Sequence, residues 1–497
     1  MNLKFCLRRA KEAHASSIAS YRPEGTITWS DLYERVNRIA GFLRDLGLQK
    51  GDRLAALLLN SHEYLELYYA SMIAGIVIVP MNTRWGVDDF AFTMRDSGAI
   101  ALAVDDRFAD IAPQLPEVAH TIYAGTGACP PGMIALADSA APHDFPEPDP
   151  EDLVGLFYTS GTTGGPKGVM LTHRNLWANM LHLLISLPLR SVWLHSAPMF
   201  HLADLGAFYS VTYQGGSHAY IATFDPEVFQ QAVERYRVTD SVLVPTMINM
   251  LINHASFGKY DLSSLQHVLY GASPMPLPLL EDAMRKLPHA HFRQGYGMTE
   301  TSPLLTVLTH EDHLGPGVTS AGRPVLGVEV RVVDALDRDV PVGETGEIIA
   351  RGANIMKGYW NRPEITAEVL RGGWMHTGDL GRFDQHGYLY ILDRKKDMIK
   401  PGGENVYSPE VESSIMAHPD VLECAVIGVP HEKWGEAIRA VIARRNGSEL
   451  TGESLIAWCR EHMTHFKCPT SVVFVDALPK GGTGKVQKNV LREKFGV

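Results

Sequence analysis

Short apolar segments alternate with helical segments between residues 153 and 286, and this alternation restricts the possible folds more than any other feature of the chain. Strands separated by helices of about 10–15 residues are typical of parallel βαβ units. Asp225-Pro226 marks one helix start, because an aspartate cap followed by proline favours initiation. The expected strands are 153–159, 192–197, 217–221, 241–245, 267–270 and 290–294, and the expected helices are 175–187, 226 onward, the segment ending at 251, and 277–286. The predicted fold class is α/β.

The two ends of the chain differ from this central region. A helix at 32–48 and a strand at 53–59 predict a further α/β region, and the proline-rich stretch 141–153 predicts a linker between the two. Beyond residue 322, short β segments between Gly, Pro and Asp turns predict a small antiparallel β-barrel. A charged run then follows Asp393-Arg394. We therefore expect a large N-terminal domain, 1–394, and a small mobile α+β domain, 395–497.

Composition narrows the possible partners and location. The 497 residues include 45 Lys and Arg against 56 Asp and Glu, which gives a net charge of −11. Nucleic-acid-binding proteins normally carry a basic field, so we expect no nucleic-acid partner. No apolar stretch reaches the roughly 20 residues of a membrane-spanning helix, so we expect no transmembrane segment. The five cysteines are odd in number and lack C-x-x-C spacing, which favours a reducing compartment, and we expect a cytoplasmic protein.

The segment 158–168 reads YTSGTTGGPKG and directly follows an apolar strand. Its glycines allow several backbone N–H groups to point at one ligand, and its hydroxyls and lysine add donors, which suits a polyphosphate. It is not the P-loop of kinases and GTPases, because Pro166 replaces the second glycine and Gly168 replaces the hydroxyl residue. The candidate phosphate-binding residues are Thr159, Ser160, Gly161, Thr162, Thr163, Gly164 and Lys167.

Four further segments are weak signals when each is taken alone. The tyrosine in 294–300 (QGYGMTE) suits stacking on a base, and the glutamate suits Mg²⁺. Asp379, in a Thr-Gly-Asp turn, can accept the two hydroxyls of a ribose. The run 393–405 is also typical of a solvated surface. Lys485, in the glycine loop 479–486, is either part of a tail or a mobile point charge for a substrate.

Taken together, the five segments resemble, in order and spacing, the adenylate-forming superfamily of acyl-CoA synthetases, firefly luciferase and peptide-synthetase adenylation domains. The resemblance extends from about residue 28 to residue 488 and is nearest to the fatty-acyl-CoA and coumarate-CoA ligases. It implies two half-reactions. A carboxylate attacks the α-phosphorus of ATP to give acyl-AMP and pyrophosphate, and a thiol then displaces AMP. The implied cofactors are ATP, Mg²⁺ and coenzyme A, and the implied substrate is a small carboxylic acid.

The resemblance also implies roles for individual residues. The glycine loop described above holds the β- and γ-phosphates, Thr299 contacts the α-phosphate, and Glu300 holds Mg²⁺. Lys485 bridges the carboxylate and the α-phosphate during adenylation. The residues implied for the adenine slot and the ribose are Gly271, Ala272, Ser273, Gln294, Gly295, Tyr296, Asp379 and Arg394.

Lys396 matches the hinge of the family. Rotation about it is expected to remove Lys485 and to bring Lys400, Gly402 and Gly403 toward a pantetheine tunnel. Lys400 also matches an adenylation-state contact in some relatives, and coumarate ligases often carry a lysine where this chain has Gly402. Both readings of Lys400 stay open at this stage.

Fewer residues indicate the identity of the acid than indicate the ATP site. His201 matches a histidine near the acid, and it replaces the aspartate that pairs with the substrate ammonium in amino-acid adenylation domains; a buried structural histidine is the alternative. Asp204 would favour an amine-bearing acid if it faced the pocket, and Arg293 would suit a dicarboxylate. The apolar pocket segments favour a fatty or aryl acid. A carrier-protein pantetheine is the alternative acceptor, and a homodimer stays open.

Overall fold

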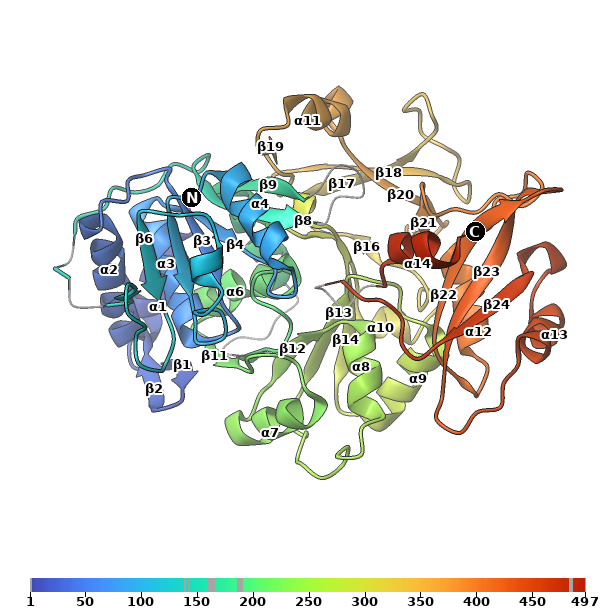
Figure 1. The fold of residues 1–497 in the computed structure, drawn as a ribbon, viewed down its shortest axis with the longest axis horizontal. Helices are drawn as coiled ribbons and strands as arrows, with labels where there is room; N and C mark the ends of the chain where they lie inside the picture. The colour runs from blue at the N-terminus through green and yellow to red at the C-terminus, as the bar shows by residue number, and fades with distance from the viewer. Residues whose placement is uncertain are drawn as a thin grey trace.

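The structure is a computed structural model that describes residues 2–137, 140–141, 143–159, 166–185, 191–481 and 486–496. Two large sheets, which we name sheet A and sheet B, carry most of the chain (Figure 1). In spatial order, sheet A consists of β16 (Arg323–Pro324), β15 (Leu304–Leu308), β14 (His291–Gly297), β13 (His267–Gly271), β12 (Asp240–Leu243), β10 (Val192–His195), β11 (Ser217–Tyr220), β1 (Ile18–Arg22) and β2 (Gly25–Thr28). Sheet B consists of β19 (Gly358–Tyr359), β9 (Lys167–Thr172), β8 (Leu153–Thr159), β4 (Val77–Pro80), β3 (Arg53–Leu57), β5 (Ala101–Val104), β6 (His120–Tyr123) and β7 (Ile134–Ala135).

Helices fill the space between the sheets and cover their outer faces. The helices that share a core with the inner faces are α1 (Lys4–His14), α2 (Trp29–Asp45), α3 (His62–Ala74), α5 (His173–Leu184) and α6 (Leu202–Gln214). The outer face of sheet A is covered by α7 (Pro226–Tyr236), α8 (Pro245–Ile252) and α9 (Leu277–Lys286), and that of sheet B by α4 (Val87–Ser97). Burial of both faces explains why the central parallel strands of sheet B, β3, β4 and β5, are almost wholly apolar.

The predicted parallel α/β architecture is confirmed, and Asp225 does cap α7, accepting hydrogen bonds from the N–H groups of Glu227 and Val228. The predicted linker between two regions is wrong as a boundary. β1 pairs with β11 in sheet A, and β4 pairs with β8 in sheet B, so the segments before and after 141–153 share both sheets. These pairings join residues far apart in sequence, and local composition does not carry them.

The predicted small β-barrel is also wrong. The strands are β17 (Val328–Val333), β18 (Gly346–Gly352), β20 (Met375–Phe383) and β21 (Leu389–Arg394). They form an open antiparallel sheet in the order β17-β18-β20-β21, with β17 and β21 as its edges. A closed barrel has no edge strands, so a sheet whose first and last strands do not pair is open. α10 (His310–His313) precedes this sheet, and α11 (Pro363–Val369) lies in the connection from β19 to β20.

The C-terminal part has its own sheet and its own apolar core, and it lies at one side of the molecule (orange and red in Figure 1). Its elements are α12 (Ser408–Met416), β22 (Val421–His431), β23 (Gly435–Arg444), α13 (Gly452–His462), β24 (Ser471–Val475) and α14 (Lys488–Phe495). Among the described helices of the whole chain, none has the length and apolar character needed to cross a membrane.

Candidate active site

Three of the predicted segments meet where sheet A adjoins the small sheet. The Tyr296 hydroxyl donates to Asp379 Oδ2 at 2.8 Å, and Arg394 Nε lies 3.7 Å from Asp379 Oδ1. Asp379 and Arg394 are cross-strand partners on β20 and β21. Burial raises the pKa of Tyr296 well above its usual value, and the neighbouring Asp379 carboxylate raises it further. The tyrosine therefore stays neutral and keeps its proton for Asp379.

A second group links the phosphate loop to Glu300. Thr159 and Lys167 are paired at the ends of β8 and β9, and Lys167 Nζ lies 5.6 Å from the centre of the Tyr359 ring. The Tyr359 hydroxyl donates to Glu300 Oε1 at 2.8 Å. Burial and the Glu300 carboxylate both raise the pKa of Tyr359. Ser160, Gly161, Thr162, Thr163 and Gly164 lie outside the described residues.

Tyr359 is a site residue that the sequence analysis missed. It reaches the site because β19 pairs antiparallel with β9, which places Tyr359 opposite Val169. The segment 358–360 (GYW) carries no periodic signal, and the pairing spans almost two hundred positions of sequence. The one available hint was an aromatic residue directly after a glycine, which is a weak indication by itself.

The ends of β13 and β14 form a surface of bare backbone. Gly271 lies opposite Gly295, and a Cβ atom added to Gly271 would collide with the Gly295 carbonyl oxygen. Ala272 follows with φ of +67°, a conformation that favours glycine. Ser273 comes next, and Gln294 accepts a hydrogen bond from the Tyr270 hydroxyl. Thr299 and Glu300 lie together in the single 3-10 turn that follows β14, Thr299–Thr301.

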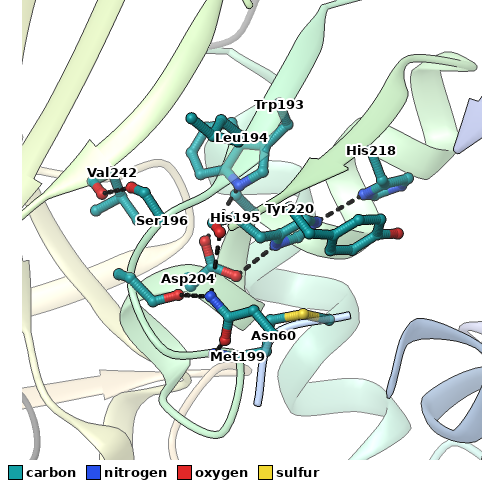
Figure 2. Close-up of polar contacts among 12 residues, drawn as sticks. Asn60, Trp193, Leu194, His195, Ser196, Met199, Asp204, His218, Tyr220 and Val242 are labelled. Atoms are coloured by element: carbon teal, nitrogen blue, oxygen red, sulfur yellow. Dashed lines mark hydrogen bonds and ion pairs between the residues drawn. The ribbon is translucent and has the colours of Figure 1, made fainter. Parts of the chain in front are cut away.

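His201 stands at the N-terminus of α6, where its Nδ1 accepts a hydrogen bond of 3.1 Å from the Ala203 N–H. The preceding loop is fixed by Asn60, which donates to the carbonyls of His195 and Ala197 and accepts from the Met199 N–H at 2.7 Å (Figure 2). The loop and the helix start thus have a defined geometry.

Asp204 faces neither solvent nor a substrate pocket. Its Oδ2 lies 2.5 Å from His195 Nδ1, and its Oδ1 accepts a 3.2 Å hydrogen bond from Trp193 Nε1 (Figure 2). His195 Nε2 lies 2.9 Å from His218 Nδ1, and burial followed by the charge of His195 lowers the pKa of His218 well below its usual value. Asp204 therefore links α6 to β10, and both of its carboxylate oxygens already have partners inside the protein. This removes the reason for expecting an amine-bearing acid.

The segment after Arg394 is tied to the C-terminal helices. Asp393 Oδ2 accepts hydrogen bonds of 2.7 Å from both the N–H and the hydroxyl of Ser408, and Asp397 pairs with Arg492 at 2.8 Å. Burial is the main cause that lowers the pKa of Lys396, and the charge of Arg394 adds to it. The predicted hinge residue Lys396 thus lies between two anchored carboxylates, Asp393 and Asp397.

The predicted tunnel residues form an exposed turn. Lys400 N–H donates to Glu436 Oε2 at 2.6 Å, and Gly402 N–H donates to the Trp434 carbonyl at 2.9 Å. Gly402 and Gly403 have φ of +61° and +94°, a region that favours glycine. In this structure the turn does not join the Tyr296 or Glu300 groups through any contact between described residues.

The glycine loop near the C-terminus lies against the N-terminal part. Arg84, in the loop between β4 and α4, donates to the Gly481 carbonyl at 3.3 Å. Lys485 lies outside the described residues, so its predicted position stays a prediction. Burial lowers the pKa of Arg84.

This combination of sequence motifs and geometry agrees with the comparisons with known proteins. The AMP-binding enzyme model matches residues 7–360, and the AMP-binding enzyme C-terminal domain matches residues 410–485. The chain belongs to the AMP-binding enzyme family. The predicted membership of the adenylate-forming superfamily is thereby confirmed, as is the fold class apart from the barrel.

Individual members of the AMP-binding family resemble the chain over its full length. It is 42% identical to a feruloyl-CoA synthase of Amycolatopsis sp, over 99% of this chain and 98% of the relative. It matches ATP-bound MatB from Rhodopseudomonas palustris with a TM-score of 0.89 and 33% identity, covering 100% of this chain and 99% of that one. It matches o-succinylbenzoate CoA synthetase (MenE) from Bacillus subtilis, in complex with an acyl-adenylate, with a TM-score of 0.87 and 29% identity, covering 98% and 97%.

The buried Asp204 cluster yields a prediction about stability. Replacing Asp204 by alanine leaves His195 and Trp193 without their partner in a fully buried setting, and breaking such a pair costs about 3–5 kcal/mol. Asp204→Asn should lower the free energy of unfolding by less than Asp204→Ala does, because the amide oxygen can still accept one hydrogen bond. Urea unfolding measures both.

The matched control is Asp261→Asn, since Asp261 pairs with Arg237 at the surface, where ion pairs contribute little to stability. A free energy of unfolding for Asp204→Ala that falls no further than that of the control would contradict the assignment.

Proposed function

We propose that the protein is an AMP-forming acid–CoA ligase that activates an aryl carboxylic acid. The observation that carries this is the joining of Tyr296, Asp379 and Arg394 beside the Lys167–Tyr359–Glu300 group, which places a nucleoside site next to a phosphate and cation site. The family and the full-length likeness to a feruloyl-CoA synthase support the ligase class and favour an aryl over a fatty acid.

ATP binds across the two groups. The bare backbone at Gly271 and Gly295 and the residues beside it, Ala272, Ser273, Gln294 and Tyr296, provide a flat slot for adenine. Asp379 accepts from the ribose hydroxyls, with Arg394 beside it. The loop from Thr159 to Lys167 donates to the β- and γ-phosphates, and Thr299 donates to the α-phosphate.

Glu300 fits a Mg²⁺ site. It is buried, and the Tyr359 hydroxyl orients its carboxylate in the way that supporting hydrogen bonds orient metal ligands. One carboxylate suffices for this ion, because Mg²⁺ in nucleotide sites is held mainly by phosphates and water. When bound, the ion neutralises charge on the phosphate oxygens. A cluster of three or more ligating side chains is not present in the described part of the chain.

The acid lies beside His201 at the start of α6. Its carboxylate oxygen forms a bond to the α-phosphorus while the bond from that phosphorus to the bridging oxygen breaks, and pyrophosphate leaves with the electron pair. Lys485 stabilises the charge that develops between carboxylate and α-phosphate. The CoA thiol then bonds to the acyl carbon, loses its proton and displaces AMP.

The two half-reactions use two orientations of the C-terminal domain, 395–497. Lys396 is the pivot, and its rotation replaces Lys485 by the turn that contains Lys400, Gly402 and Gly403. The Arg84 hydrogen bond to Gly481 supports an adenylating orientation in this structure, because it holds Gly481 of the C-terminal domain against the N-terminal domain.

The proposal is tested by measuring pyrophosphate release from ATP and Mg²⁺ over cinnamates, benzoates, fatty acids of two to eighteen carbons and amino acids, each with and without CoA. We expect aryl acids to give the highest rate of pyrophosphate release, and we expect CoA to raise turnover. Turnover with fatty acids alone would contradict the aryl assignment. A response to a pantetheinylated carrier protein but not to CoA would contradict the CoA assignment.

The role of Lys485 can be separated from folding. Lys485→Ala should lower the rate of acyl-AMP formation by about a thousandfold or more, because it removes a group that stabilises developing charge. It should leave thioester formation from supplied acyl-AMP and CoA within a few-fold of the parent. Equal loss of both half-reactions would refute this role. Lys494→Ala, on the exposed end of α14, is a matched control for the loss of a C-terminal lysine.

A further inference from the structure

The side chains on the inner face of sheet A form three rows, fixed by the strand register. In the row nearest the candidate site, Gly271 lies opposite Gly295 and carries no side chain. Two residues further back along the strands, Leu269 lies opposite Arg293, with Val242 beside them. Since alternate residues of a strand face the same side, Arg293 lies directly behind Gly295, at a distance of about 7 Å.

The third row is unusually polar for a face buried between helices. Asp240 lies opposite His267, with Trp193 beside it. Asp240 Oδ1 is 3.0 Å from His267 Nδ1, and the Asp240 side chain is 1% exposed. The second carboxylate oxygen accepts a hydrogen bond from the Thr239 hydroxyl.

A small cleft opens between the second and third rows. It is lined by Leu183 of α5 together with Trp193, Asp240, His267, Leu269 and Arg293, and it has room for a group about the size of one water molecule. The Nη1 atom of Arg293 is buried here and has no hydrogen-bond partner among the described residues. A buried donor without a partner costs free energy, so a ligand oxygen at this position would restore a missing hydrogen bond.

We propose that Arg293, with Asp240 and His267, forms a subsite for an oxygen substituent at the far end of the acid substrate. The acid class is an aryl acid that bears a ring hydroxyl remote from its carboxylate. This inference rests on the proposed function, because it places the far end of the acyl group behind the Gly271–Gly295 pair, beside Leu269 and Arg293.

The chemistry of the cleft favours this class over the alternatives. Arg293 donates to the ring oxygen, and the Asp240–His267 pair provides an acceptor for the hydroxyl proton. Leu183, Trp193 and Leu269 give the cleft apolar walls, which suit the edge of an aromatic ring next to its hydroxyl group. A fatty acid would place its terminal methyl group against the Arg293 guanidinium and leave this donor without a hydrogen-bond acceptor. A distal carboxylate would meet Arg293, but also the buried charge of Asp240.

The test compares two acids of equal size, 4-hydroxycinnamate and 4-methylcinnamate, by kcat/KM for pyrophosphate release. One hydrogen bond to a charged group predicts a preference of about 10- to 100-fold for the hydroxyl acid. In Arg293→Met this ratio should fall to within about threefold, and in Arg293→Lys it should be intermediate. General damage to the fold lowers both acids together and leaves the ratio unchanged.

Arg285→Met on α9 is the matched control, because Arg285 is exposed and pairs with Asp282 on its own helix; it should keep the parent ratio. A parent ratio within threefold, or an unchanged ratio in Arg293→Met, would overturn the subsite while activity with both acids left the proposed function intact. If neither these acids nor any of the wider panel releases pyrophosphate, the proposed function itself fails.

Discussion

The parallel register between β13 and β14 is the constraint on which the rest of the site depends. It sets Gly271 against Gly295, where any side chain on Gly271 would strike the neighbouring backbone. The bare surface leaves room for a planar group. β13 ends at Gly271 and the chain leaves the sheet at Ala272, whereas Tyr296 stays in β14 opposite Thr306. The same register places Arg293 behind the glycines. One pairing thus orders both the proposed nucleotide slot and the proposed acyl subsite.

The Tyr296–Asp379–Arg394 contact connects this part of sheet A to the small antiparallel sheet. It is one of the polar links between sheet A and the small sheet, and it lies immediately before the segment that leads to the C-terminal domain. Asp393, next to Arg394, bonds to Ser408 of that domain. A nucleotide held at Asp379 would therefore lie beside Arg394, one residue before the proposed start of the mobile domain, where binding could be coupled directly to the proposed rotation.

Local signals in the sequence predicted the parts of the site that are contiguous. Glycine loops, the Asp225 helix cap and the alternation of strands and helices depend on neighbouring residues, and they located most elements within a few positions. Tyr359, the Asp204–His195 pair and the surroundings of Arg293 arise from contacts between distant strands and helices, so no local pattern indicated them. The barrel, and the role of 141–153 as a boundary between two regions, were wrongly predicted for the same reason, because closure and strand pairing are long-range properties.

The most direct test of this account is the affinity for ATP and for 2′-deoxy-ATP, measured by calorimetry on the parent and on Asp379→Asn. Hydrogen bonds from both ribose hydroxyls to a carboxylate predict that the parent prefers ATP by about tenfold or more. The substitution should weaken ATP binding and reduce that preference to near unity, while Asp261→Asn changes neither. ATP binding by Asp379→Asn that equals the parent's would contradict the claim that the nucleotide binds across the Tyr296–Asp379 contact.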